Sequence, residues 1–542
     1  MRESNIRKSS PLLKPRSAKP ANAKPASAKP SPSSSKPPRG EPPALRVAEP
    51  TLPAGHDDAA RVALQKTRSA WIIDGDVERA RSRYFDVARG LKRPALFVAA
   101  SLGSLERDKA RLLEQGVRVV LLQPVDGRIA RADLEALRNG GPLLVLVTSE
   151  ALHQEEVLRA LERAAIGSVT IDGAELAAER GHEFRPSFAR LPTALQRLGK
   201  VSLFALSRPV PAAVRREAQQ RLGMADTLLV EAPALEPSVL LDTRAVRGER
   251  RNATLLEVLA ELPRPGVVLC ATPHEVDGVC AVLGAERGLL CRVHAGMPSA
   301  ERAAMLEQFQ VEERPALLVT TSALAPEMGI PGLVESPGAE ARIGFGSGRT
   351  RRDLAFVLHH HAPASLEQYL RELSGLGAGG SPATALMFYD SAHRSMNQAI
   401  LEQQRLPAHK VEPLARALES VLAAGKPLKL EALALQTGLS RRSSERLLAL
   451  FVDAGIVRRD KGGLSLLATG DALQASVGAL SAALEGLQRG DATRLGAVER
   501  YAEASECKRK VLAQRFGGAG EAACGHCSSC LARSANKQRA RG

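Results

Sequence analysis

The sequence predicts an α/β protein with two consecutive domains, each built on a mainly parallel sheet, followed by a helical part that carries a metal site. Short apolar runs alternate with amphipathic stretches from about residue 61, and the alternation restarts after Pro237. After about Pro413 the strand pattern stops and helical periodicity replaces it. Four of the seven cysteines lie in the segment from Cys507 to Cys530.

The composition favours a nucleic-acid partner. The net charge is +16, and a basic excess attracts a polyanion such as DNA, whereas aromatic residues make up only 3% and limit base stacking. No apolar run approaches the roughly 18 residues that span a bilayer, so we expect no membrane association. No secretory hydrophobic segment follows Met1, and we therefore expect a cytoplasmic, nucleoid-associated protein with reduced cysteines.

Residues 1–58 are expected to form a disordered basic tail. Residues 1–50 hold 11 Lys and Arg against 3 Asp and Glu, together with 11 of the 34 prolines. A segment rich in Pro, Lys, Ala and Ser buries too little apolar surface to offset its ordering entropy. Its role is open between a solubilising tail and a nonspecific DNA-tethering arm. A second, short basic tail is expected at residues 533–542.

Two α/β domains are expected at residues 59–236 and 237–398, and a pair of this size resembles a RecA-like pair. Buried strands that alternate with helices form a mainly parallel sheet. The expected strands are Ala70–Ile73, Ala95–Ala100, Val117–Leu122, Leu143–Thr148, Ser168–Asp172 and Val201–Leu206 in the first domain, and Gly266–Ala271, Leu289–His294, Ala316–Thr321 and Ala355–His359 in the second. The expected helices include Leu105–Gln115, Ala151–Ala165, Glu275–Leu283, Ser299–Gln310 and Ser365–Leu373.

Residues 399–470 are expected to form a winged-helix domain. Three helices precede a hairpin, namely Ala415–Ala424, Lys429–Thr437 and Ser440–Ala454, then strands Ile456–Arg459 and Leu464–Leu467. Ser440 is a suitable N-cap, and Gly455 is a suitable helix stop. Basic residues lie on both elements that would meet a DNA backbone, namely Arg441, Arg442 and Arg446 on the third helix and Arg458, Arg459 and Lys461 on the hairpin. The alternative is a solvated face on a protein-interaction module.

Residues 471–532 are expected to form a zinc-binding module. Cys524, Cys527 and Cys530 form two overlapping C-x-x-C units, and Cys507 stands upstream at the end of a helical stretch. A C-x-x-C turn places two thiolates on one ion, and the other cysteines complete a closed tetrahedral shell, which is typical of structural zinc. Disulfides and reactive thiols are the alternatives, and a reducing compartment disfavours disulfides. His526 competes as a ligand, but an inward turn inside a C-x-x-C loop is awkward.

Several segments together resemble one family. The sequence GAVERYAEASECKRKVLAQRFGG…CGHCSSC (496–530) is similar to the zinc-binding region of RecQ DNA helicases, including the pair Phe516-Gly517. Further segments resemble the Walker B motif, the aromatic-rich loop, the HAG segment and the stretch before motif VI, namely IDGAE (171–175), RGHEFRPSF (180–188), VHAGM (293–297) and PASLEQY (363–369). The resemblance implies ATP binding between two RecA-like domains, with hydrolysis driving 3′ to 5′ movement on DNA.

The phosphate loop that such an enzyme needs is missing from the sequence. No G-x-x-x-x-G-K-[ST] occurs, and after Ile73 the chain reads DGDVERA (74–80). Its acidic residues would repel a triphosphate, and no hydroxyl remains there to hold magnesium. A Gly- and Pro-rich insertion at residues 331–350 also interrupts the motif V region. A role for ATP and Mg²⁺ is therefore in doubt.

Catalytic positions have changed in both domains as well. Asp172 of the Walker B motif is retained, but Gly173 stands at the catalytic glutamate position and Glu175 at the histidine position. In the second domain Gly375 and Ala378 replace the two arginines of motif VI, and loss of an arginine finger alone costs roughly 10³ to 10⁵ in rate. The sequence thus predicts no catalytic residue beyond the remnant Asp172 and no nucleotide-binding residue.

Together these features predict a RecQ-like DNA-binding protein with a structural zinc site that lacks ATP hydrolysis and unwinding and acts in DNA repair or recombination, where protein partners are also expected. Phe184 and Arg185 are further DNA-contact candidates, as a stacking ring and a phosphate contact, and packing of their loop against the first domain is the alternative. An active ATP-dependent 3′–5′ DNA helicase is the alternative function. A protein-interaction scaffold without DNA binding is the second alternative.

Overall fold

The structure, a computed structural model, describes the chain from residue 62 to residue 539. Within that range it leaves out residues 66, 125–127, 180–183, 225, 249, 285–288, 311–315, 322–352, 424–429, 461–462 and 518–522. The expected tail at residues 1–58, the insertion at residues 331–350 and Lys461 therefore lie outside the described residues.

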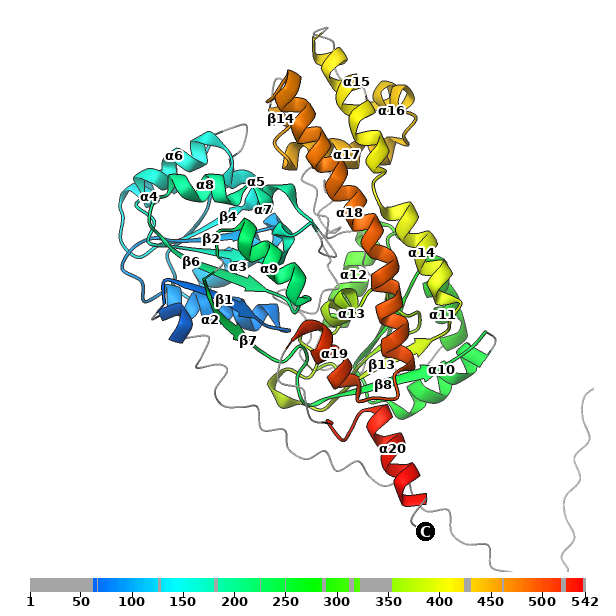
Figure 1. Cartoon of the computed structure of the whole chain (residues 1–542). Helices are drawn as coiled ribbons and strands as arrows, with labels where there is room; N and C mark the ends of the chain where they lie inside the picture. The colour runs from blue at the N-terminus through cyan, green and yellow to red at the C-terminus, as the bar shows by residue number, and fades with distance from the viewer. Residues whose placement is uncertain are drawn as a thin grey trace, which may run out of the picture. The chain divides into compact units, whose positions relative to one another are not determined.

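Seven parallel strands form the first sheet, in the order β3-β4-β2-β5-β6-β1-β7. They are β1 (Ser69–Ile73), β2 (Ala95–Ala99), β3 (Val119–Leu121), β4 (Leu144–Thr148), β5 (Ser168–Asp172), β6 (Ser202–Ser207) and β7 (Leu228–Glu231). Figure 1 shows the helices between them, which are α2 (Val77–Ala88), α3 (Leu102–Glu114), α4 (Arg131–Arg138), α5 (Ser149–Leu152), α6 (Glu155–Arg163), η1 (Ala174–Ala177), α7 (Pro186–Ala189), α8 (Leu191–Arg197) and α9 (Ala212–Arg221). The six expected strands are confirmed, and β7 was not expected.

The strands of the first sheet are apolar on both faces. In β2, Leu96 and Val98 belong to one buried apolar cluster, whereas Phe97 between them belongs to another cluster on the opposite face. Burial on both faces explains the uninterrupted apolar runs in the sequence. Because the strands are parallel, the carboxyl ends of β1 and β5 meet at one edge, where Asp74 and Asp172 lie.

Six parallel strands form the second sheet, in the order β10-β11-β9-β12-β13-β8. They are β8 (Val239–Ala245), β9 (Gly266–Cys270), β10 (Leu289–Val293), β11 (Ala316–Thr321), β12 (Phe356–His359) and β13 (Ala383–Tyr389). The accompanying helices are α10 (Arg250–Glu261), α11 (Pro273–Leu283), α12 (Ser299–Gln310), α13 (Leu366–Glu372) and η3 (Ala378–Gly380). The four expected strands are confirmed, whereas β8 and β13 were not expected.

The C-terminal part is mainly helical, and its elements contain the expected three helices and hairpin. They are α14 (His393–Gln404), η4 (Ala408–Lys410), α15 (Val411–Ala423), α16 (Leu430–Thr437), α17 (Arg441–Asp453), β14 (Val457–Asp460), β15 (Gly463–Leu466), α18 (Gly470–Glu503), α19 (Lys508–Phe516) and α20 (Ser528–Arg539). The hydroxyl of Ser440 accepts a hydrogen bond from the backbone N–H of Ser443 at 3.1 Å, and Gly455 has a φ of 68°, so the predicted N-cap and stop of α17 are confirmed. In the described part of the chain, no helix combines the length and apolar character needed to cross a bilayer.

Three helical segments differ from expectation. The helix expected at Ala151–Ala165 is divided, because α5 ends at Leu152 and α6 begins at Glu155. Residues 533–539, expected as a tail, continue helix α20. The 34-residue helix α18 (Figure 1) was not expected, and it joins two buried cores: Leu473 and Leu487 pack with the winged-helix part, whereas Tyr501 packs with the second sheet.

Candidate metal centre and altered nucleotide-site region

The four cysteines of the C-terminal module meet at one point. Cys507 precedes α19, Cys524 and Cys527 precede α20, and Cys530 lies in the first turn of α20. Their sulfur atoms all lie within 4.8 Å of one another, and the Sγ atoms of Cys507 and Cys527 are 4.0 Å apart. Zn–S bonds of about 2.3 Å in a tetrahedron separate the sulfurs by about 3.8 Å. The arrangement therefore fits a structural zinc ion.

Hydrogen-bond donors around the sulfurs favour thiolates. The backbone N–H of Cys524 donates to Sγ of Cys507 at 3.3 Å, and that of Lys508 donates to Sγ of Cys527 at 3.4 Å. The backbone N–H of Cys527 donates to Sγ of Cys524 at 3.4 Å. Nδ1 of His526 lies 2.7 Å from the carbonyl oxygen of Cys524, and this histidine is not part of the ligand cluster. The residues present thus supply a closed S4 shell with supporting donors.

Two basic side chains next to Cys507 anchor this module to its neighbours. Lys508 is buried, and its Nζ donates to the carbonyls of Tyr501 and Ala502 at 2.7 and 2.9 Å, which caps the C-terminal end of α18. The guanidinium of Arg509 donates to backbone carbonyls of the segment that leads into β8, namely those of Leu235, Glu236, Pro237 and Val239 at 3.2, 2.6, 3.2 and 2.6 Å.

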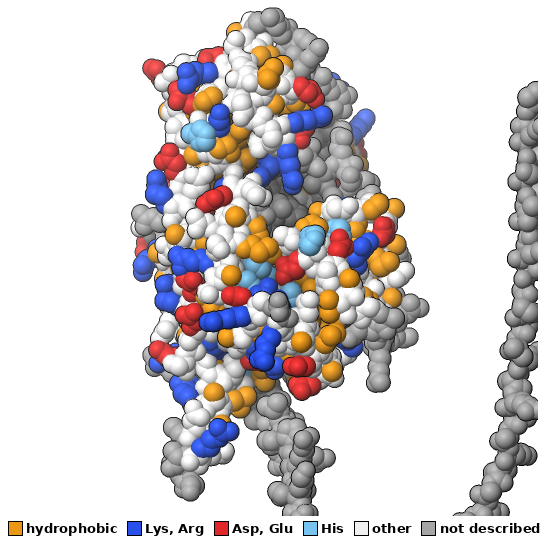
Figure 2. Space-filling model, turned by 90° about the vertical axis from the view of Figure 1, so that its right-hand side faces the viewer, with side chains coloured by type: hydrophobic (Ala, Val, Ile, Leu, Met, Phe, Trp, Pro, Cys, Tyr) orange, Lys and Arg blue, Asp and Glu red, His pale blue; other side chains and the backbone are white. Residues whose placement is uncertain are grey.

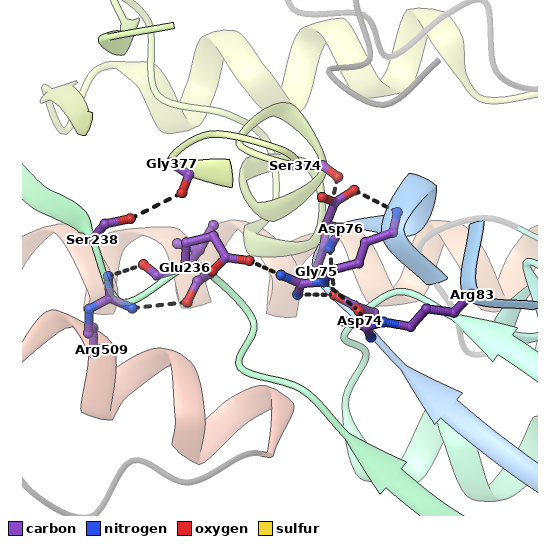
Figure 3. Close-up of polar contacts among 11 residues, drawn as sticks. Asp74, Gly75, Asp76, Arg83, Glu236, Ser238, Ser374, Gly377 and Arg509 are labelled. Atoms are coloured by element: carbon purple, nitrogen blue, oxygen red, sulfur yellow. Dashed lines mark hydrogen bonds and ion pairs between the residues drawn. The ribbon is translucent and has the colours of Figure 1, made fainter. Parts of the chain in front are cut away.

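Charged side chains of the chain itself fill the junction between β1 and α2, where the phosphate loop is missing. Asp74 is fully buried, and its carboxylate accepts hydrogen bonds from Arg79 at 2.6 and 3.0 Å and from Arg83 at 3.2 Å (Figure 3). Burial raises the pKa of Asp74 to about 6, although Arg79 opposes that rise. Asp76 caps α2 by accepting a hydrogen bond from the backbone N–H of Arg79 at 3.1 Å. Carboxylates thus occupy a helix N-terminus that would otherwise favour a phosphate.

Asp172, the retained Walker B residue, is paired with an arginine. Nε of Arg81 donates to the Asp172 carboxylate at 3.0 Å, and a second guanidinium nitrogen contacts the same oxygen. Arg81 also lies 3.3 Å from Asp108 and 3.8 Å from Glu78. All four side chains are buried, and burial raises the pKa of Glu78 to about 7. The charge of the Asp172 carboxylate is therefore compensated within the fold by Arg81.

Two glycines that the family resemblance places at catalytic positions have backbone conformations that suit glycine. Gly173 has φ 75° and ψ 36°, and Gly375 has φ 80°, a left-handed region that other residues enter at a cost. Next to Gly173, Glu175 is buried, and its Oε1 accepts a hydrogen bond from the backbone N–H of Arg208 at 3.5 Å. Burial raises the pKa of Glu175 to about 7. A glutamate at position 173 would therefore meet both backbone strain and a carboxylate neighbour.

The arginines predicted to contact DNA from the third helix of the winged-helix part, the recognition helix, lie near the start of α17. Arg441 and Arg442 are exposed, and Arg441 forms ion pairs with Glu431 and Glu445, each at 3.1 Å. Arg446 is half-buried, and burial lowers its pKa. Arg442 is therefore the best placed of the three to contact a phosphate, and DNA contact by this helix stays a prediction.

The hairpin supplies less information on DNA contact. Arg458 is exposed on β14, whereas the side chain of Arg459 and the whole of Lys461 lie outside the described residues. On the face shown in Figure 2, basic and acidic side chains are interspersed and form no single basic field. DNA contact by this hairpin also stays a prediction.

Phe184 and Arg185 lie inside the protein, with 8% and 6% of their surfaces exposed. Phe184 belongs to the apolar cluster of the winged-helix part, which also contains Phe451. The guanidinium of Arg185 donates to Glu150 at 3.1 Å. The structure therefore shows packing for Phe184 and Arg185, although Phe184 packs with the winged-helix part instead of the first domain. A DNA contact by either residue stays a prediction that requires this packing to open.

Three arginines that organise these regions were not predicted from the sequence. The segment 74–81 was interpreted for its missing phosphate loop and its acidic residues, and the alternation of these residues with Arg79 and Arg81 was the available signal. Arg509 follows Cys507 closely, within the basic run KRK (508–510). Only the tertiary structure shows that all three bind carboxylates or carbonyls that are distant in sequence.

Comparisons with known proteins agree with the resemblance. The sequence model of the RecQ zinc-binding family matches residues 476–531. The chain is 25% identical over 273 residues to the ATP-dependent DNA helicase hus2/rqh1 of Schizosaccharomyces pombe, which covers 49% of this chain and 19% of that protein. It is 20% identical to the probable ATP-dependent DNA helicase RecS of Bacillus subtilis, over 56% of this chain and 58% of RecS. It is 22% identical to the ATP-dependent DNA helicase RecQ of the same organism, over 65% of this chain and 56% of RecQ.

Two tandem RecA-like domains followed by a four-cysteine module make up the described part of this chain. The chain is a distant relative of RecQ DNA helicases, and its C-terminal part matches the RecQ zinc-binding family model. It spans less than two thirds of the length of each of the three curated relatives. The predicted family and fold class are thereby confirmed.

Proposed function

We propose that this chain is a RecQ-like DNA-binding protein with a structural zinc site that neither hydrolyses ATP nor unwinds DNA, and that it acts in DNA repair or recombination. The observation that carries the proposal is the pairing of Arg81 with Asp172. Magnesium in a phosphoryl-transfer site neutralises charge that develops on the phosphates. A carboxylate already bound to a guanidinium has little capacity left for that cation.

The junction after β1 supports the same proposal. Asp74 and Asp76 place carboxylates at the start of α2, where an ATP-binding protein presents backbone N–H groups and a lysine to phosphates. Arg79 supplies a positive charge there, but it is bound to Asp74 and Glu236. A triphosphate would have to break these ion pairs and would still meet the two aspartates.

In this proposal the zinc module and the winged-helix part retain the binding function. Cys507, Cys524, Cys527 and Cys530 hold Zn²⁺, which contributes folding energy and leaves no open coordination position for chemistry. Exposed arginines of α17 contact DNA phosphates, with Arg442 as the leading candidate. The curated relatives named above are DNA helicases, which supports DNA as the partner. The same reasoning favours a nucleoid-associated location.

An ATP-dependent 3′–5′ DNA helicase is the second candidate, because the relatives are named as ATP-dependent DNA helicases and the family resemblance implies the 3′–5′ direction. The test is DNA-stimulated ATP hydrolysis by the purified full chain, with Asp172→Asn as the matched variant. We expect no difference between the two proteins. Turnover that depends on Asp172 would overturn the proposal in favour of the helicase.

A parallel measurement addresses DNA binding. We expect the full chain to bind duplex or single-stranded DNA with an affinity that falls as the salt concentration rises, because released counterions drive phosphate contacts. Binding that is absent, or that does not respond to salt, would favour a protein-interaction scaffold.

A further inference from the structure

The loop after β1 is tied to the connection between the two sheets. Residues 232–238 link β7 to β8, and Glu236 within them is buried and forms an ion pair with Arg79 (Figure 3). At the same place the backbone of the connection approaches Gly75. A Cβ added at Gly75 would lie 2.3 Å from the carbonyl oxygen of Ala234, so only glycine fits there. Arg79 therefore joins Asp74 of the first domain to Glu236 of the connection.

A loop of the second domain closes on the same two segments. The hydroxyl of Ser374, just after α13, donates to the carbonyl of Gly75 at 2.7 Å. The hydroxyl of Ser238 in the connection donates to the carbonyl of Gly377 at 3.2 Å. A Cβ at Gly377 would lie 2.7 Å from that Ser238 hydroxyl. The loop at residues 374–377 thus contacts both the β1–α2 junction and the connection.

The zinc module also contacts the connection between the two sheets. The guanidinium of Arg509 in α19 donates hydrogen bonds to four backbone carbonyls, those of residues 235, 236, 237 and 239. Arg509 is half-buried, and burial lowers its pKa. Carbonyls that would otherwise need water are therefore satisfied by one side chain next to the cysteine cluster.

We propose that Gly75, Arg79, Glu236, Ser374 and Arg509 form an interdomain clasp that holds the two RecA-like domains in one arrangement without a nucleotide. Domains that close around a ligand depend on the ligand for the contacts that bridge them. Here the bridging contacts come from side chains of the chain itself. Asp74 and Glu236 are buried, so removing Arg79 from them would leave buried carboxylates without compensation, which makes the clasp costly to open.

The clasp concerns domain motion and goes beyond the loss of ATP hydrolysis. A chain without ATPase activity could still open and close, so the two proposals can fail separately. The test is hydrogen exchange of the backbone amides in residues 232–239 of the zinc-loaded full chain. In the unmodified protein the N–H of Ala232 donates to Ile73 and that of Val239 to Glu236, so both amides report on the clasp.

Glu236→Gln removes the negative charge that Arg79 binds. Arg509→Met removes the hydrogen bonds from the guanidinium to the backbone carbonyls of the connection. We expect each change to raise exchange at Ala232 and Val239 by at least about tenfold. Glu485→Gln is the control, because its ion pair with Arg489 is exposed and lies on α18. Should Glu236→Gln fail to fold, as judged by circular dichroism, Ser374→Ala removes a single hydroxyl and is expected to raise exchange by a smaller factor.

Small-angle X-ray scattering supplies an independent measurement. We expect the radius of gyration of the unmodified chain to stay the same when ATP and Mg²⁺ are added. A nucleotide-dependent change in scattering, or exchange rates in Glu236→Gln and Arg509→Met equal to those of the control, would overturn the clasp.

Discussion

Arg81 in the middle of α2 and Asp172 at the end of β5 form a buried ion pair, with Nε of Arg81 3.0 Å from the Asp172 carboxylate. The same guanidinium reaches Asp108 of α3, so one arginine compensates carboxylates from two further elements. This pairing makes Asp172 and Arg81 part of the buried core of the first domain.

Replacing Arg81 with methionine is expected to destabilise the chain by about 3 to 5 kcal/mol, because Asp172 and Asp108 would stay buried without a counter-charge. Arg131→Met is the control, since Arg131 forms an exposed i,i+4 pair with Glu135 and should cost less than about 1 kcal/mol. Urea unfolding followed by circular dichroism measures both values. Equal costs for the two variants would contradict a structural role for Arg81.

Restoring a glutamate at position 173 is expected to reduce stability by about 1 to 2 kcal/mol without creating ATPase activity. The left-handed backbone of Gly173 accounts for the cost, and a Cβ there would also lie 3.2 Å from Cδ1 of Leu176. Gly278→Ala is the matched control, because Gly278 lies inside α11 with open space around it. This variant should be more stable than the parent by about 0.5 to 1 kcal/mol. A Gly173→Glu variant as stable as the parent would show that the backbone is not strained by a side chain.

Glu175→Gln is expected to change how stability depends on pH. The pKa of buried Glu175 is about 7 in the folded chain against 4.5 when exposed, so the folded state holds this proton more tightly. Its contribution to stability is therefore complete below pH 4.5 and is lost as the pH rises to about 7. Glutamine cannot ionise, so its free energy of unfolding lacks this loss. Relative to the parent, the free energy of unfolding of the variant should rise by up to about 1.4 kcal/mol per pH unit across that window.

The unfolding free energies of the parent and Glu175→Gln would be compared from pH 4 to pH 8. Glu106→Gln, on the exposed side of α3, serves as the control and should leave the slope unchanged. Parallel curves for the parent and Glu175→Gln would contradict the raised pKa.

Cys524→Ser is expected to remove zinc and to destabilise the C-terminal module, because structural zinc contributes folding energy directly. Elemental analysis should find about one zinc ion per parent chain and much less in the variant. Cys280→Ser is the control, since Cys280 lies outside the cysteine cluster. A parent protein purified without zinc, yet with a folded C-terminal module, would rule out the metal site.

Arg442→Ala is expected to weaken DNA binding on all sequences to a similar extent. One lost phosphate contact should reduce the slope of log affinity against log salt by about 0.9 on duplex DNA. Arg416→Ala on α15 removes an exposed arginine that is paired with Glu412 outside the recognition helix, and it should leave the slope unchanged. Identical slopes for the parent and Arg442→Ala would exclude this residue from the interface.

Local sequence patterns predicted the elements that depend on residues close to one another in the sequence. The run Ala95–Ala100 is apolar throughout, because β2 is covered on both faces, and the pattern therefore shows in the sequence. Ser440 and Gly455 bound α17 through interactions that span only a few residues. The edge strand β8 lacks such a pattern, since its second half is half-buried or exposed.

Helix α18 illustrates a structure that tertiary contacts stabilise against local preference. It contains five glycines, among them Gly478 and Gly490, and glycine lowers helix propensity by about 1 kcal/mol each relative to alanine. Burial of Leu473 and Leu487 in one core and of Tyr501 in another offsets this cost. The periodicity of the isolated segment did not indicate 34 continuous helical residues.

By itself the sequence determined the cysteine spacing, the two α/β domains and the absence of a phosphate loop, because each depends on residue types at short, countable separations. Tertiary structure alone decided which charged side chains pair with one another. The ion pairs of Arg79 with Glu236 and of Arg81 with Asp172 join residues 157 and 91 positions apart. A charged side chain has no periodicity that reveals its partner, so only the packing of the strands and helices selects one carboxylate from many.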